Sequence, residues 1–262
     1  IDTEDQNFER FNEETGFDPR RDLQSFVFAS PASSNGGAES RFAILARGTF
    51  DQPRMEAAAK ARGATVQNYE GVDLILDKSS NQKTGFAFPD VGVAVMADVT
   101  TLREIIANRA ASTALDPTLQ EMMSKTGSDN DAWFVCLTGG SYLSRHLNHE
   151  TKQPMQQAQA LESVLRSSGG IRFGSVVELS FDAVTRSPKD ATSLTDVIRF
   201  LSSLVQMQRQ NDPRADILAS SLDQMSLTTN GDAMHVSISL PEKTLEQLAD
   251  SGPRASTGRT HR

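Results

Sequence analysis

The sequence predicts an α+β fold: antiparallel sheets with helices packed on one face, arranged as two lobes of β-β-α-β-β-like units. Short apolar runs bounded by Gly, Ser, Asn and Asp are typical of strands. Longer segments carry apolar residues at helical spacing, and the Asn230-Gly231 pair between two alternating runs is the strongest hairpin signal of the chain. Neighbouring strands joined by short turns favour antiparallel pairing.

The first lobe opens with two apolar runs separated by the Ser/Gly/Asn-rich segment 31–40. An Ala-rich helix that ends before Gly63 follows them, because glycine commonly terminates helices. The predicted order is strands at 23–29 and 41–50, a helix at 53–62, and strands at 65–69 and 72–77.

The same lobe continues with a predicted hairpin at 84–88 and 92–97. A helix at 101–109 follows, where Thr101 and Glu104 have capping-box spacing. A helix at 117–125 and a strand around Trp133 complete a lobe that we expect to cover 17–143.

The second lobe is expected over 155–250, after a polar connection at 144–154. The chain ends are expected to be an acidic arm at 1–16 and a disordered tail at 251–262. The predicted elements are a helix at 155–167 broken by Gly169-Gly170, a strand at 171–182, a helix at 193–210, a hairpin at 225–229 and 233–240, and a helix at 241–250.

Four helix starts share one chemistry, an Asp followed at once or nearly so by Pro. The Asp carboxylate can accept the free N–H groups of the first turn, and proline loses nothing at the first helical position. We therefore interpret these pairs as caps rather than recognition motifs. They lie at Asp18-Pro19, Asp51 with Pro53, Asp116-Pro117 and Asp212-Pro213.

Composition narrows the classes of function. The net charge is −8 and aromatic residues make up 6% of the 262 residues. Both features argue against nucleic-acid binding, which relies on Lys and Arg at phosphates and on rings that stack with bases. No stretch reaches the about 20 apolar residues of a membrane span. Cys136, the single cysteine, lies in an apolar run and is expected to be a buried hydrophobe.

One cluster could bind a metal. His146 and His149 lie three positions apart beside Glu150, and this trio could supply zinc or iron ligands. The order does not fit the usual zinc-hydrolase patterns, and the segment is polar, so we expect these residues to be solvent-exposed. No nucleophile elbow, phosphate loop or dinucleotide fingerprint occurs. We therefore predict no catalytic residues, no cofactor and no metal, with these three as weak candidates.

Three segments resemble a known group of proteins: Thr15–Leu23, Ala46–Asp51 and Trp133–Val135. They are similar to segments of uncharacterised exported α+β proteins of the acidobacterial and planctomycete type, over most of residues 15–250. The resemblance implies a periplasmic or secreted location and brings no catalytic residue. Because the chain begins at Ile1, removal of a leader is one explanation that fits.

The sequence therefore favours a non-enzymatic cell-envelope or secreted protein that binds another protein or a small ligand. Two alternatives stay open: a hydrolase built from scattered acids with His146 or His149, and a structural oligomerisation module. Eight residues are expected in the core: Phe42, Ile44, Leu45, Phe50, Trp133, Val135, Leu201 and Val205.

Overall fold

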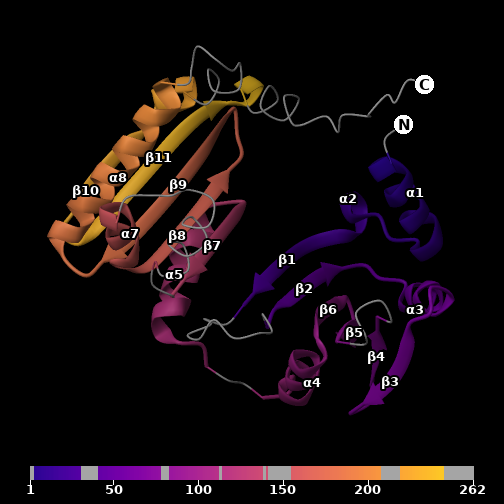
Figure 1. Cartoon of the computed structure of the whole chain (residues 1–262). Coiled ribbons are helices and arrows are strands. Elements are labelled where there is room, and N and C mark those ends of the chain that lie inside the picture. Colours follow the sequence, from indigo (N-terminus) through magenta and orange to yellow (C-terminus); the bar gives the residue numbers. More distant parts are fainter. Residues whose placement is uncertain are drawn as a thin grey trace, which may run out of the picture. The chain divides into compact units, whose positions relative to one another are not determined.

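The computed structural model describes residues 3–30, 41–77, 83–111, 114–137, 140, 155–207 and 219–244. The chain divides into two compact units, Ile1–Ala114 and Leu115–Arg262. Each unit contains one antiparallel sheet, which confirms the α+β class (Figure 1). Among the helices of the described ranges, none combines the length and apolar character that a membrane crossing requires.

The first unit contains a six-stranded sheet in the order β1-β2-β6-β5-β4-β3, with every neighbouring pair antiparallel. Its elements are α1 (Thr3–Thr15), α2 (Pro19–Asp22), β1 (Leu23–Ala29), β2 (Ala43–Gly48), α3 (Gln52–Ala61), β3 (Thr65–Tyr69), β4 (Val72–Leu76), β5 (Thr84–Asp90), β6 (Val93–Asp98) and α4 (Val99–Asn108).

The core of the first unit lies between this sheet and α4. Leu102 and Ile106 of α4 are buried against Leu74, Ala87 and Val95, which project from three neighbouring strands. The side chain of Asp98 caps α4, since its Oδ1 accepts from the backbone N–H of Thr101 at 2.9 Å. The capping box expected to begin at Thr101 is therefore wrong, because the helix begins two residues earlier.

Helix α1, which lies within the acidic arm expected at 1–16, is attached to α3. Arg54 Nε donates to the carbonyl oxygen of Glu14 at 3.2 Å, and Arg62 Nε donates to the Glu14 carboxylate at 2.8 Å. Arg54 of α3 and Arg62, which follows this helix, thus hold the C-terminal end of α1 in place.

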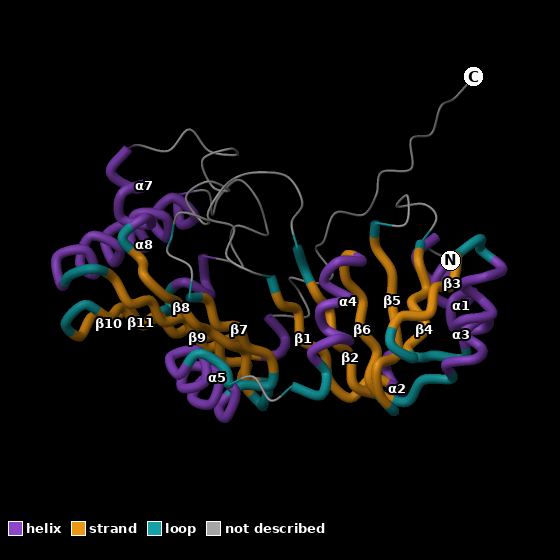
Figure 2. Tube along the Cα trace, turned by 90° about the horizontal axis from the view of Figure 1, so that it is seen from below, coloured by secondary structure: helices purple, strands orange, loops and turns teal. Residues whose placement is uncertain are grey.

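The second unit contains a five-stranded antiparallel sheet in the order β10-β11-β9-β8-β7. Its elements are α5 (Pro117–Asp129), β7 (Ala132–Cys136), α7 (Met155–Glu162), β8 (Val164–Arg172), β9 (Val176–Thr185), α8 (Pro188–Met207), β10 (Ser226–Asn230) and β11 (Ala233–Pro241). Helices α7 and α8 lie on one side of this sheet and α5 lies on the other (Figure 2).

The predicted connection at 144–154 lies outside the described residues, and the chain divides into its two units between Ala114 and Leu115. The strand that carries Trp133 pairs with β8, so it belongs to the second sheet and not to a lobe ending at 143. Gly169 and Gly170 do not break a helix; they lie inside β8, and the single strand expected at 171–182 is two strands joined at 173–175. The prediction that Gly169 and Gly170 end a helix is therefore wrong. In β8 these glycines instead allow neighbouring residues to pack closely against the strand.

The expected core is only partly correct. Leu45 packs against the core of the first unit, but Trp133 is 38% exposed. The other six expected residues are half-buried. The buried positions are instead filled mainly by aliphatic residues, such as Leu74, Val95 and Leu102. Three Asp caps are confirmed, at Asp18, Asp51 and Asp116, while Asp212 lies outside the described residues.

Candidate functional site

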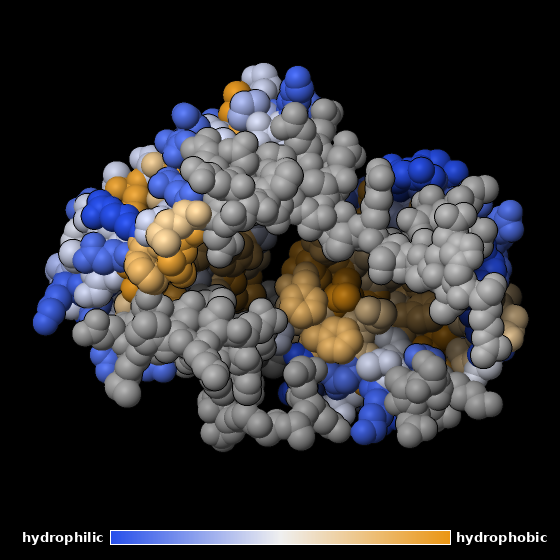
Figure 3. Space-filling view, turned by 45° about the horizontal axis from the view of Figure 1, so that its top comes forward, coloured by the Kyte–Doolittle hydropathy of each residue, from blue (hydrophilic) through white to orange (hydrophobic). Residues whose placement is uncertain are grey.

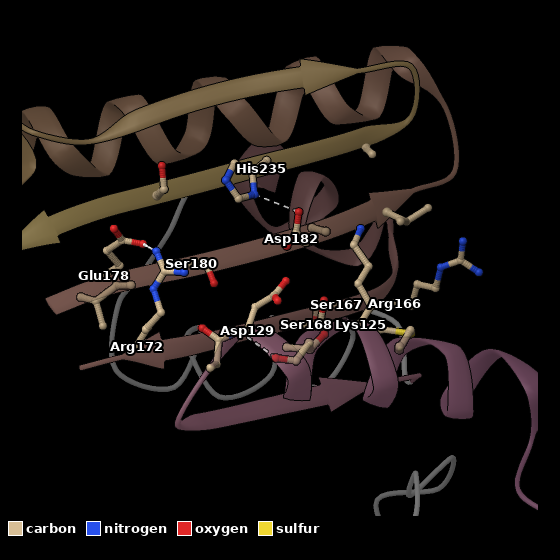
Figure 4. Close-up of a pocket in the computed structure, with 18 of the residues that line it drawn as sticks. Lys125, Asp129, Arg166, Ser167, Ser168, Arg172, Glu178, Ser180, Asp182 and His235 are labelled. Carbon is tan, nitrogen blue, oxygen red and sulfur yellow. Dashed lines mark hydrogen bonds and ion pairs between the residues drawn. The ribbon is translucent and has the colours of Figure 1, made fainter. Parts of the chain in front are cut away.

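A groove of about 740 Å³ lies in the second unit, between α5 and the strands β8, β9 and β11. We call it the groove throughout. Figure 4 shows its polar side chains, with Lys125 and Asp129 reaching over it from α5. Its floor is formed by side chains that point away from α8. The volume lies in the range of about 300–1,000 Å³ typical of ligand sites.

The polar floor follows from strict alternation along the strands. In β9, Glu178, Ser180 and Asp182 face the groove, whereas Val177 is buried on the opposite face. The register continues this pattern across β11, where Ser239, Ser237 and His235 lie opposite those three residues in the same order. Three polar rows therefore run across the sheet.

Two glycines allow α5 to approach the sheet closely. A Cβ on Gly170 of β8 would lie 2.2 Å from Cγ of Asn130, so only glycine leaves room for this amide. A Cβ on Gly127 would lie 3.1 Å from the Trp133 ring. These contacts seat the C-terminal end of α5 over β7 and β8 and fix one wall of the groove.

The best-defined contact of the floor joins His235 to Asp182. Their Nδ1 and Oδ1 atoms are 2.9 Å apart, and each side chain is about half exposed (45% and 47%) (Figure 4). The carboxylate orients the imidazole, as in catalytic dyads. Among the described residues, however, the other ring nitrogen of His235 has no hydrogen-bond partner, so the geometry assembles no activated serine.

Some of the other charged side chains of the groove are paired with each other, and some are not. Arg172 and Glu178 form an ion pair at one end of the floor (Figure 4). The side chains of Lys125 and Arg166 form no hydrogen bond or ion pair within the described parts of the chain. These two cations are therefore available to a bound molecule.

The sequence-predicted metal candidates, His146, His149 and Glu150, lie outside the described residues, so the hydrolase alternative built on them stays a prediction. Among the residues that the structure describes, no group of three or more His, Cys, Asp or Glu side chains has the arrangement of a metal site. Sequence reasoning missed the groove because its floor depends on the register between β9 and β11. The alternation in 177–181 was the one available signal.

A second surface distinguishes the first unit. On the face of its sheet opposite α4, Phe26, Phe28 and Met96 are exposed, at 67%, 61% and 44%. Figure 3 shows apolar residues, in orange, at the surface of this unit. At another part of the same unit a series of ring contacts joins Phe17 to Phe50, at 5.3 Å between centroids, and Phe50 to Phe88, at 5.7 Å.

Comparison with known proteins gives little further guidance. No family model and no curated protein matches the chain. Among solved structures, it is similar to crystal form I of TP0453, with a TM-score of 0.49 and 11% identity, over 94% of this chain and 89% of that chain. A likeness this distant carries no argument about function.

Proposed function

We propose that this chain is a binding protein rather than an enzyme, and that the groove of the second unit is its ligand site. The observation that carries the proposal is the polar floor: three adjacent strands align hydroxyl, carboxylate and imidazole groups beneath a helix seated by Gly170. A polar sheet face that only contacts bulk water does not need a helix such as α5 packed over part of it.

The chemistry of the groove favours binding over catalysis. Its best-oriented pair, His235 and Asp182, has no hydroxyl hydrogen-bonded to the second ring nitrogen in the described residues, and a nucleophile needs such a base. The side chains that line it offer several hydrogen-bond donors and acceptors instead. A small polar ligand fits this inventory.

The proposed setting is the cell envelope or the extracellular space. It is supported by the resemblance of Thr15–Leu23 and the two other segments to exported proteins. Fractionation of cells that express the full-length protein tests the setting. Recovery in the cytoplasmic fraction alone would contradict it.

The ligand site is tested by ligand-observed NMR with a pool of small organic acids, amines, amino acids and sugars. Ser180→Trp fills the centre of the floor, and Ser175→Trp, in the exposed turn between β8 and β9, is the matched control. We expect binding to the wild type and to the control, and its loss in Ser180→Trp. Equal binding by both variants, or no binding to the wild type, would contradict the proposal.

A second candidate, an oligomerisation module, is favoured by β1. This strand ends the six-stranded sheet and exposes three successive apolar side chains, Phe26, Val27 and Phe28. Exposed apolar edge strands pair readily with another chain. If β1 pairs between copies, light scattering gives a multiple of the monomer mass, and Val27→Lys returns it to the monomer. A monomeric wild type at all concentrations excludes this candidate.

A further inference from the structure

The two sides of the groove carry charges that alternate in sign. On α5 the charges recur every four residues, which places them on one face of a helix. These residues are Glu121, Lys125 and Asp129. On the strands, Asp182 lies between the cation Arg166 at one end and Arg172 at the other. Neither side of the groove presents a single sign of charge.

The charges of α5 and those of the strands do not neutralise one another. Among the described residues, no ion pair joins α5 to the strands of the floor, and Asp129 accepts a hydrogen bond only from the Ser128 hydroxyl, at 3.1 Å. Lys125 extends from α5 in the direction of the strand that carries Asp182, yet no ion pair forms (Figure 4). The charges therefore border the open volume of the groove.

This pattern discriminates between classes of ligand. A simple anion would gain from Lys125 and Arg166 but would lie close to the carboxylates of Asp129 and Asp182. A simple cation would gain from the two carboxylates but would lie close to the two positively charged side chains. Like charges brought together at a binding site cost affinity, so interspersed signs select against both. A molecule that carries both charges satisfies the two sets at once.

We propose that the groove binds a small zwitterion of the amino acid or short-peptide type. Its carboxylate lies at Arg166 and Lys125, and its ammonium group lies at Asp129 and Asp182. The planar guanidinium of Arg166 suits a carboxylate, because its N–H groups match both oxygens. The hydroxyl group of Ser180 is available to the polar atoms between the two charges. This inference rests on the proposed function, since it names the ligand of the same groove.

The test compares trialanine with two derivatives that each lack one charge, N-acetyl-trialanine and trialanine amide. Titrations of the full chain are followed by calorimetry and by amide chemical shifts. We expect trialanine to bind about tenfold or more tightly than either derivative, because each loses a charge-assisted hydrogen bond. The shifts should cluster at Ser168, Ser180 and Ser237, which line the floor.

Two variants assign the ends of the ligand. Arg166→Met should weaken trialanine and the acetylated peptide but leave the amide unchanged. Asp129→Asn should weaken trialanine and the amide but leave the acetylated peptide unchanged. Arg199→Met and Asp196→Asn are the matched controls, because both residues are exposed on α8, which packs on the other face of the sheet. Neither control should alter any affinity.

The outcomes separate this inference from the proposed function. Blocked peptides that bind in the groove as tightly as trialanine overturn the zwitterion and leave a ligand site in place. Trialanine that produces no shift in the groove also overturns it. In that case the fragment pool with Ser180→Trp decides whether the groove binds any ligand at all.

Discussion

In both units, one face of the sheet is covered by a helix and forms the core. The other face differs between the units, because it is apolar in the first and polar in the second. In both units a helix buries aliphatic side chains against alternate strand positions, with Leu102 of α4 in the first and Leu194 of α8 in the second. The remaining face is apolar along β1, β2 and β6, where Phe26 and Met96 are exposed. It is polar along β8, β9 and β11, where Ser180 and His235 line the groove.

This difference shows that packing a helix on a sheet determines the residue types on only one of its two faces. One face must be apolar to supply a core, and the free face can then evolve toward solvent, ligand or partner. In the second unit the polar rows are also covered at one side by α5, which water alone does not require. The contrast between the two free faces therefore supports the proposal that the ligand site lies in the second unit.

The largest expected effect on stability comes from the helix-covered apolar core that each unit contains. Leu102→Ala and Leu194→Ala each remove a side chain that is at most 2% exposed, so each should lower the free energy of unfolding by about 2–5 kcal/mol. Urea denaturation followed by circular dichroism measures the loss. Leu165→Ala, at a side chain 49% exposed, is the control and should cost clearly less. Equal losses in all three variants would show that the two cores are misplaced.

The next effect concerns the wall of the groove. Gly170→Ala forces a Cβ against Asn130, so it should displace the end of α5 and destabilise the protein by about 1–3 kcal/mol. Gly174→Ala is the matched control, since its Cβ would meet only an ordinary contact at 3.4 Å. Thermal denaturation gives the stability, and Trp133 fluorescence reports on the packing of α5. An unchanged spectrum in Gly170→Ala would contradict the seating of this helix.

A smaller effect concerns the cap of α4. Asp98→Ala removes the acceptor of the Thr101 N–H group and should cost about 1 kcal/mol. Burial alone would raise the pKa of Asp98, but hydrogen bonds from the Thr101 hydroxyl and amide, aided by the charge of Arg41, outweigh it and lower this pKa. Because the folded pKa lies below the unfolded one, the stabilisation is complete above about pH 4 and is lost as the pH falls through the folded value.

Asp98→Asn isolates the charge from the hydrogen bond, because asparagine also caps helices. We expect its unfolding free energy to fall less steeply than that of the wild type between pH 4 and pH 2, on the scale set by the ordinary Asp pKa of about 3.9. Acid titrations at fixed urea measure both slopes. Identical slopes would contradict the lowered pKa.

The smallest effect on stability concerns the apolar free face. Phe26→Ser changes a side chain that is 67% exposed, so the free energy of unfolding should change by no more than about 0.5 kcal/mol. Binding of a hydrophobic dye such as ANS should nevertheless decrease. Ser226→Ala, on the exposed edge strand of the second sheet, should leave dye binding unchanged. A large loss of stability in Phe26→Ser would show that this face is buried.

Much of the fold could be predicted from local signals. The hairpin over Asn230-Gly231 is confirmed, with Asn230 opposite Ala233 and Gly231 at φ 60°. The Asp caps at Asp51 and Asp116 are confirmed as well, because each depends on only a few neighbouring residues. Turn and cap chemistry is local, so sequence alone is sufficient there.

The sequence-based predictions failed where tertiary packing outweighs the local conformational preference of a residue. Gly169 and Gly170 resemble a helix stop, yet Gly170 lies in a strand because Asn130 needs the space above it. Trp133 resembles a core residue, but it lies on a strand at the edge of the sheet and packs against Gly127 with part of its ring exposed. The groove depends on which residues of β9 and β11 lie opposite each other, and no local pattern encodes that register.

We propose that ligand binding belongs to the polar free face of the second unit and not to the apolar free face of the first. The most direct measurement is a map of amide chemical shifts in the labelled full chain, recorded with the pool of small polar molecules. We expect the changes to gather at Ser168, Ser180 and His235 in the groove. Changes that gather instead at Phe26, Phe28 and Met96 would contradict the claim and assign binding to the first unit.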